Sequence, residues 1–383
     1  MAAPRVLVLH NRYRIEGGEE RSVALQIDAL RAAGIEHHAL ERSSGDASRT
    51  RAASALLRGG EKAGEIAAAV DRLGANVVHA HNMLPLIGPR GLVAARDRGA
   101  AVVLHLHNVR LFCAIGVASR DGGPCFRCHG RLTLPGLVLN CRGSLPEAAV
   151  YAAALSLHQP RVLEAVDRFV TPSRYAAEQL AVLGLPRERV DVLPHYLPAG
   201  AFATASAADQ GGYALAAGRL SPEKGFDVAI AAAAASEVPL RIAGEGPAAG
   251  QLSALARRLD APVELMGRLP RPELDDLVRG AAMLVMPSRY HEFSPYAALE
   301  AMAAGVPVVA TRMGGLPELI GLERCLAIND SQALAARMRE LWESPEPRRA
   351  EGEALLARAR VNHSRERFVA GLLDLYARVT SLN

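Results

Sequence analysis

The feature that most constrains the fold is a repeated alternation of short apolar strands with helical segments. Apolar runs such as VLVLH and NVVHAH are each followed by a segment of helical character that a glycine often ends. Strands that alternate with helices of about 10–15 residues indicate βαβ units and a parallel sheet. Strands are predicted at 5–10, 37–40, 76–81, 101–108, 168–173 and 189–198, and again at 213–217, 239–243, 263–267, 283–287 and 306–311.

Two such series occur, separated by a small, polar, glycine-containing stretch at 198–212 that reads as a linker. We therefore predict an α/β protein of two Rossmann-like domains, 1–200 and 201–363, facing across a deep cleft. Ligands on parallel sheets lie beyond the carboxyl ends of the strands. Polar residues stand at several of these ends, among them His10-Asn11, His81-Asn82 and His107-Asn108.

The composition of the chain excludes several classes of function. The 383 residues are 50% apolar, enough for two domains with cores of their own. A net charge of +4 is too small to indicate nucleic acid, and no apolar run reaches the length of a membrane span. Because the strand VLVLH begins at Val6, too early for a secretory signal, we expect a cytoplasmic protein, with peripheral contact at the inner membrane face left open.

The positive charge is almost entirely arginine. Of 44 basic residues only Lys62 and Lys224 are lysines, so a lysine marks a place where a compact point charge is wanted. Lys224 lies in GRLSPEKG, directly after the first strand of the second series, with Arg219 five residues before it. A guanidinium fork and an ammonium on one loop suit a diphosphate. The alternative is an ordinary loop with two solvated cations.

A second motif is PSRYHEFSPYAALEAMAAGVP, residues 287–307. Glu292 lies in a loop and Glu300 about two turns into the following helix, far enough apart to span a nucleotide sugar. Ser294 is predicted to be the helix N-cap, and the helix N-terminus favours an anion. Since the helix is otherwise nearly all apolar, Glu300 should be buried and need a hydrogen-bond partner such as a ribose. The alternative is a capped helix with a solvated glutamate.

Two glycine pairs complete the pattern. Gly314-Gly315 follow the strand at 306–311, and Gly17-Gly18 follow the first strand. Adjacent glycines allow the backbone to approach a ligand closely, although each pair alone is equally compatible with a tight turn.

In this order and spacing, GRLSPEKG, the E-x7-E of Glu292 and Glu300, AMAAGVPVVAT and GGLPE resemble the family 4 retaining glycosyltransferases of GT-B fold. GGEE, VVHAHN and HLHN in the first half agree, and a terminal helix at 364–383 resembles the one that crosses back onto the N-terminal domain in that family. The resemblance implies an acceptor-binding first domain and a nucleotide-sugar donor domain.

Carried over by position, the resemblance implies that Arg219 and Lys224 bind the donor diphosphate and that Glu300 holds the ribose. Glu292 would contact the donor sugar near the reacting carbon, as a positioning residue rather than a nucleophile. Phe293 and Ser294, with Gly314 and Gly315, would complete the donor site. Phe293 stands where the family usually has glycine, which leaves the sugar open.

In the first domain the resemblance implies that the backbone at Gly17 and Gly18 approaches the phosphates and that His107 lines the sugar and acceptor side. It implies a UDP- or GDP-sugar donor and front-face attack, in which the leaving phosphate helps to take the acceptor proton. Cations on the leaving group stabilise its developing charge, so no catalytic metal is required. The acceptor is expected to be a carbohydrate, lipid-linked or small-molecule hydroxyl; an epimerase and a non-catalytic binding protein are the alternatives.

Four of the five cysteines form a cluster. Cys113, Cys125, Cys128 and Cys141 fall within 29 residues, and a CxxC flanked by two further cysteines in a cytosolic chain suits a structural zinc site. His129 is an alternative ligand. Reduced thiols in a loop core, or a redox pair, are the other interpretations. A zinc site here would hold the loop that leaves the strand of His107.

Overall fold

The computed structural model describes residues 3–14 and 17–381, so Glu16 of the first glycine motif and the last two residues of the predicted terminal helix lie outside it. The chain divides into two compact units. Unit 1 comprises Met1–Ala118, Phe126–His195 and Arg365–Asn383, and unit 2 comprises Ser119–Cys125 and Tyr196–Ser364.

Unit 1 is built on a parallel sheet in the order β2-β1-β3-β4-β7-β8. Its strands are β1 (Arg5–Arg12), β2 (Glu36–Ser43), β3 (Val77–Ala80), β4 (Ala101–His105), β7 (Arg168–Thr171) and β8 (Val190–Val192). The strand order reverses between β1 and β3, which makes their carboxyl ends a topological switch point, where ligands of such sheets bind. Asn11 and Asn82 join the two strands there, since each donates an N–H to the other's carbonyl at 2.7 Å.

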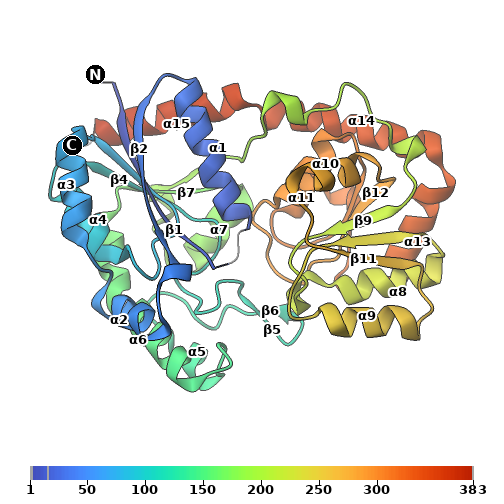
Figure 1. The fold of residues 1–383 in the computed structure, drawn as a ribbon, viewed down its shortest axis with the longest axis horizontal. Helices are drawn as coiled ribbons and strands as arrows, with labels where there is room; N and C mark the ends of the chain where they lie inside the picture. The colour runs from blue at the N-terminus through green and yellow to red at the C-terminus, as the bar shows by residue number, and fades with distance from the viewer. Residues whose placement is uncertain (1–2, 15–16, 382–383) are drawn as a thin grey trace. The chain divides into compact units, whose positions relative to one another are not determined.

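The helices of unit 1 are α1 (Gly18–Ala32), α2 (Arg49–Arg58), α3 (Ala63–Leu73), α4 (Gly88–Arg96), α5 (Leu134–Val138), α6 (Leu145–Ala165), α7 (Arg174–Val182) and α15 (Arg365–Thr380). The last of them, α15, lies along α1 and against β3 and β4 (Figure 1). Tyr376 of α15 is 1% exposed, and its hydroxyl lies 2.9 Å from Nδ1 of His79. The far end of the chain therefore completes the core of the first unit.

One helix of unit 1, α2, lies in a polar segment for which the sequence analysis predicts no strand or helix. The arginine-rich stretch at 42–60 contains α2, which packs on α6 and buries Leu56 to 3% exposure. Ser48 caps this helix, accepting a hydrogen bond from the Arg51 amide at 3.2 Å. Capping and one buried stripe are enough for a ten-residue helix once a partner helix is present.

Unit 2 is built on a second parallel sheet, in the order β11-β10-β9-β12-β13-β14. Its strands are β9 (Ala214–Ala217), β10 (Leu240–Ala243), β11 (Val263–Gly267), β12 (Met283–Met286), β13 (Val308–Thr311) and β14 (Cys325–Leu326), and the hairpin of β5 (Ser119–Arg120) and β6 (Gly123–Pro124) is assigned to the same unit. The order reverses between β9 and β12, so the loops after these two strands meet at the switch point.

The helices of unit 2 are α8 (Phe226–Ser236), α9 (Ala249–Arg258), α10 (Arg271–Arg279), α11 (Tyr296–Ala303), α12 (Leu316–Ile320), α13 (Ser331–Glu343) and α14 (Pro345–Asn362). Short 3-10 turns lie at η1 (Ser44–Asp46), η2 (Arg187–Arg189), η3 (Ala199–Ala201), η4 (Ala208–Gln210), η5 (Pro222–Lys224) and η6 (Leu322–Arg324). The alanine-rich α8 is mostly buried and lies against α13, whose Met338 is fully buried. No helix in the described residues is both long and apolar enough to cross a membrane.

Helix α11, which carries Glu300, packs against α14. At Gly352 of α14, a Cβ would lie 2.0 Å from the carbonyl oxygen of Gly305 and 2.5 Å from Oγ of Ser206. The same serine hydroxyl donates to the Gly305 carbonyl at 2.5 Å. Gly305, which follows α11, and Ser206 thus both lie against Gly352, whose lack of a side chain allows the backbones to approach closely.

We expect Gly352→Ala to lower the free energy of unfolding by about 1–3 kcal/mol, because the added methyl group overpacks this contact. Gly250→Ala is the matched control, since Gly250 also lies in a helix and no neighbouring atom is within 4 Å of its added Cβ. That change should be neutral or stabilising by up to about 1 kcal/mol. Urea titration of both variants measures the difference, and equal stabilities would contradict the packing argument.

Candidate functional site

The loops that follow β9 and β12 carry the candidate site of unit 2. The first loop ends in η5 and Lys224, just before α8, and the second holds Tyr290 and Glu292 before α11. Because β9 and β12 are neighbours in the sheet, residues 68 positions apart in the sequence are brought into contact.

Lys224 and Glu292 form an ion pair at the centre of this site. The Lys224 ammonium donates to Oε1 of Glu292 at 2.7 Å and to the Tyr290 hydroxyl at 3.0 Å. The Tyr290 hydroxyl donates to Oε2 of Glu292 at 2.6 Å, and Ser288 donates to Oε1 at 2.9 Å. Both carboxylate oxygens are thus engaged, and the Glu292 side chain is only 5% exposed.

The ionisation of the pair follows from these contacts. Burial alone would lower the pKa of Lys224, but the adjacent Glu292 carboxylate and the Tyr290 oxygen outweigh it and raise the pKa above its ordinary value. Burial, reinforced by the Glu292 charge, raises the pKa of Tyr290. At neutral pH the site therefore holds an ammonium ion and an undissociated phenol. Of the three ammonium N–H groups, two are used in the contacts above.

Glycines let the two loops approach. Gly225 has φ +70°, and a Cβ there would lie 2.0 Å from the Pro287 carbonyl oxygen. Gly314 has φ +62°, and its Cβ would meet the Glu292 backbone at 2.1 Å. The amide of Gly315 donates to the Glu292 carbonyl at 2.6 Å. Gly314 and Gly315 thus fix the position of the Glu292 backbone. The glycine pair in the sequence does not by itself distinguish this role from direct contact with a ligand.

Arg219 is the exposed member of the predicted cation pair. Its side chain is 55% exposed and donates to Oε1 of Glu223 at 2.7 Å, which also accepts from Ser221 at 2.7 Å. Arg219 and Lys224 are therefore each paired with a carboxylate of the chain, and the four charges sum to zero. An exposed ion pair is worth little, so Arg219 can exchange this partner for a ligand at low cost.

Glu300 is buried, at 9% exposure, as its position in an apolar helix predicts. Its Oε1 accepts a hydrogen bond from Nη1 of Arg271 at 2.7 Å. The Arg271 guanidinium thus already provides one of the hydrogen bonds that buried Glu300 was expected to make with a ribose. Arg271, at the start of α10, was not identified from the sequence, because nothing in its local motif relates it to Glu300.

The start of α11 differs from the prediction. Pro295, not Ser294, is the N-cap, and no side chain caps the helix. The fixed φ of proline suits the turn before the first helical residue, Tyr296, so the cap position shifts by one. Phe293 is 6% exposed, which places its bulk inside the protein.

The first glycine motif of unit 1 forms the start of α1. The Gly17 amide donates to Oε2 of Glu20 at 2.8 Å, while the Tyr13 amide donates to Oε1 at 2.9 Å. The Glu20 carboxylate thus occupies the amide that was predicted to approach a phosphate. Burial would raise the pKa of Glu20, but the nearby His10 and the hydrogen bonds from these amides lower it. A phosphate at Gly17 would have to displace an ionised carboxylate.

Next to this motif, His107 lines a small polar pocket with Tyr13, Glu19 and Asn108. Glu19 is 8% exposed and accepts from the Tyr13 hydroxyl at 2.8 Å and from Asn108 at 3.3 Å. Burial raises the pKa of this carboxyl. Burial and the neighbouring imidazoles lower the pKa of His107, which is therefore neutral. Glu19 is a candidate that the sequence analysis passed over, although it belongs to the quoted GGEE.

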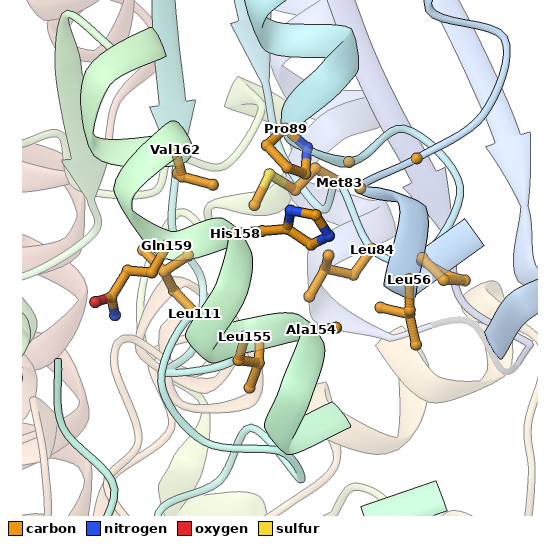
Figure 2. A pocket seen from close by; sticks show the side chains of 14 residues that line it. Leu56, Met83, Leu84, Pro89, Leu111, Ala154, Leu155, His158, Gln159 and Val162 are labelled. Carbon is orange, nitrogen blue, oxygen red and sulfur yellow. The ribbon is translucent and has the colours of Figure 1, made fainter. Parts of the chain in front are cut away.

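An apolar pocket adjoins the polar one, because both are lined by Met83, Leu84 and Leu111. Figure 2 shows side chains of α6, among them Leu155 and His158, directed toward Leu84 and Leu56. His158 is fixed by a 2.9 Å hydrogen bond between its Nε2 and the Leu57 carbonyl. The carboxyl edge of this sheet thus offers polar groups beside an apolar surface.

None of the five cysteines, all of which lie in the described part of the chain, forms a disulfide. Around Gly136 of α5, Sγ of Cys128 would lie 3.7 Å from an added Cβ, and the Cys141 amide donates to the Gly136 carbonyl at 3.0 Å. Among the described residues, the one group of three side chains with ligand atoms close enough for a single ion is His79, His81 and His105, not a set of cysteines. Cys113, Cys128 and Cys141 belong to unit 1, whereas Cys125 belongs to unit 2.

Two family descriptions match the chain. "Glycosyl transferase 4-like domain" matches residues 17–195, and "Glycosyl transferases group 1" matches residues 203–355. The chain belongs to the group 1 glycosyltransferase family. The two matches contain the loops of unit 2 and, apart from Tyr13, the polar pocket of unit 1 described above.

Relatives and solved structures agree. A D-inositol 3-phosphate glycosyltransferase of Catenulispora acidiphila is 31% identical over 268 residues, which are 63% of this chain and 57% of that protein. Sucrose-phosphate synthase of Thermosynechococcus elongatus has a TM-score of 0.73 at 17% identity, over 99% of this chain and 100% of its own. The Anabaena protein HepE, in complex with UDP, has a TM-score of 0.68 at 16% identity, over 98% and 100%.

These likenesses show that the fold is GT-B, as the sequence motifs predicted. The chain spans somewhat under three fifths of the curated relatives it matches, at 59%, 57% and 57% of their lengths.

The two lysines provide a direct test of the central ion pair. We expect Lys224→Met to lower the free energy of unfolding by about 1–3 kcal/mol, because it leaves the buried Glu292 carboxylate without its cation. Lys62→Met is the control: Lys62 is 58% exposed and pairs with exposed Glu65, so its loss should cost under about 0.5 kcal/mol.

A double-mutant cycle with Glu292→Gln should give a coupling of about 1–3 kcal/mol. Because the pKa of Lys224 is raised, this contribution is present below the ordinary lysine pKa and is lost only as pH rises through the raised value. A coupling near zero would show that the two groups do not depend on each other.

Proposed function

We propose that the chain is a retaining glycosyltransferase that moves a sugar from a nucleotide-diphosphate sugar to an acceptor hydroxyl. The observation that carries the proposal is the meeting of the Lys224 and Glu292 loops at the switch point of unit 2. Membership of the glycosyltransferase family supports it, and so does the UDP bound to the structurally similar HepE.

In this proposal the donor binds at the switch point of unit 2. Arg219 leaves Glu223 to bind the diphosphate as a fork, and Lys224 offers its remaining N–H. The N-terminus of α11, which no side chain caps, directly follows the Glu292 loop and favours an anion. Since the charges of this site already cancel within the chain, directed N–H donors contribute more to recognition than net positive charge does.

The proposed chemistry follows from where charge develops. Breaking the anomeric C–O bond leaves negative charge on the diphosphate and an oxocarbenium-like sugar. Lys224 stabilises the leaving group, and the ionised Glu292 beside it stabilises the sugar cation. Glu292 is held by Tyr290 and Ser288, so we assign it a positioning and electrostatic role. No metal is required in this scheme, and UDP- or GDP-sugars are the candidate donors.

Glu300, with Arg271, is proposed to bind the donor ribose. A carboxylate oriented by a guanidinium can accept hydrogen bonds from both ribose hydroxyls with little reorganisation. Gly314 and Gly315 act by fixing Glu292. Phe293 and Ser294 lie in the same loop, next to the proposed sugar position.

The acceptor is proposed to bind unit 1, in the pocket of His107, Glu19 and Asn108. The apolar pocket that shares its wall suits an acceptor with an apolar part beside its hydroxyl, such as a lipid-linked sugar. Approach of such an acceptor from the surface of a membrane is part of this proposal. The backbone amide of Gly17 is proposed to bind a phosphate of the donor once the Glu20 carboxylate is displaced from it.

The function is tested by incubating the protein with UDP- and GDP-sugars and following the nucleotide released. Slow hydrolysis with one donor, accelerated by an acceptor and with retained anomeric configuration, is expected. An epimerised donor would show the epimerase of the same fold instead. Donor binding without any turnover would show a binding protein.

Two substitutions separate the roles of the site. Lys224→Ala should lower kcat about a hundredfold, because its charge acts on the leaving group in the transition state. Glu300→Gln should instead raise the donor Kd about tenfold with kcat less affected, since it weakens a ground-state contact. Glu273→Gln, on the exposed surface of α10, is the control. Equal effects on kcat and Kd in both site variants would refute this division.

Structural zinc at Cys113, Cys125, Cys128 and Cys141 stays a prediction. Such a site would hold the loop that begins six residues after His107 and take no part in the chemistry. Metal analysis of the purified protein checks it: Cys128→Ser is expected to hold about one zinc fewer per chain than the unsubstituted protein. Four freely titrating thiols and no zinc would refute it.

A further inference from the structure

Three buried histidines of unit 1 have no role in the proposed reaction. His79, His81 and His105 are 0%, 1% and 1% exposed. His79 lies on β3 and His81 directly follows the end of that strand. The parallel register of β3 with β4 pairs Ala80 with Leu104, which puts His81 beside His105. All three rings therefore lie on the same face of the sheet.

The nitrogen atoms of this cluster are poorly satisfied. Each ring offers one ligand atom within 4.8 Å of the other two. Nε2 of His79, Nε2 of His81 and both ring nitrogens of His105 have no hydrogen-bond partner among the described residues. Buried polar atoms are nearly always bonded, so several of them facing one another require an explanation such as a bound ion.

The other nitrogens of the cluster are already held. Nδ1 of His79 lies 2.9 Å from the Tyr376 hydroxyl, and Nδ1 of His81 lies 2.9 Å from Nε2 of His107. This is the arrangement of metal-binding histidines, in which one ring nitrogen binds the ion and a hydrogen bond at the other fixes the orientation of the ring.

We propose that His79, His81 and His105 bind a divalent transition-metal ion of the zinc type. Three imidazoles and no carboxylate favour Zn²⁺, Co²⁺, Ni²⁺ or Cu²⁺ over Mg²⁺ and Ca²⁺, which prefer oxygen ligands. In this proposal the three imidazoles bind the ion in their neutral form. The three ligands all belong to unit 1, whereas the proposed donor residues belong to unit 2.

Binding requires a modest rearrangement. The rings of His79 and His81 are stacked at an interplanar angle of 14°, and those of His81 and His105 at 22°. Metal–nitrogen bonds of about 2.0–2.1 Å bring the ligand atoms closer together than they are in this structure. Rotation about χ2, a broad torsion in histidine, turns the lone pairs toward a common centre.

The ion would act on the acceptor pocket through one proton. With Nε2 of His81 on the metal, its proton stays on Nδ1 and is donated to Nε2 of His107. His107 then carries its own proton on Nδ1. The metal thus selects one tautomer of the residue that lines the acceptor pocket, and through Tyr376 it also ties α15 to the sheet.

Cobalt is the probe that separates this site from the cysteines, because cobalt thiolates absorb strongly in the near ultraviolet and cobalt imidazoles do not. Chelator-treated, full-length Cys125→Ser/Cys128→Ser protein is titrated with Co²⁺. We expect about one equivalent to bind, with visible d–d bands, no thiolate band and a raised melting temperature. Failure of this protein to bind Co²⁺ overturns the proposal without reference to any histidine variant.

Histidine variants in the same background locate the ion. His105→Gln should weaken Co²⁺ binding at least a hundredfold, and Tyr376→Phe about tenfold, because it removes the partner of His79. His38→Gln, at an exposed position, is the matched control and should bind normally. Circular dichroism confirms that each variant is folded. Undiminished binding by folded His105→Gln would overturn the assignment.

Discussion

The contact between Lys224 and Glu292 is the constraint on which the organisation of unit 2 depends. A buried carboxylate and a nearly buried ammonium are stable only with good geometry and further hydrogen bonds, which Tyr290 and Ser288 provide. Bringing them together requires β9 and β12 to be neighbours and requires glycine at 225 and 314, where any side chain would strike backbone. The same arrangement places a cation and an anion side by side, as a reaction that separates charge along one bond requires.

Much of the fold could be predicted from the local pattern of the sequence, whereas the candidate site could be predicted from it only in part. The alternation of apolar strands and helices predicted two parallel-sheet domains, because each strand carries its own signal. Lys224 and Glu292 were identified as site residues, but their mutual contact was not, since it depends on strand order rather than on spacing. Arg271 was missed for the same reason. Helix α2 was missed because its apolar stripe is short and becomes stable only against α6.

The two units place their chemistry at equivalent positions by different means. In unit 2 the switch point carries paired charges on loops. In unit 1 the corresponding edge carries neutral imidazoles and the buried Glu19, which burial keeps less acidic than an ordinary glutamate. Charged groups suit a diphosphate, whereas neutral polar groups beside an apolar wall suit a hydroxyl compound. The difference in electrostatics thus corresponds to the two substrates of a transfer reaction.

The position of α15 has a consequence for biosynthesis. Tyr376 and its neighbours fill the core of unit 1, yet they are translated after all of unit 2. On the ribosome, the sheet that is made first must wait with its α15 face uncovered while the second sheet is completed. Unit 2, whose segments all precede α15, can close its core earlier. The core of unit 1, most of which is made first, is therefore completed by a helix that is made after all of unit 2.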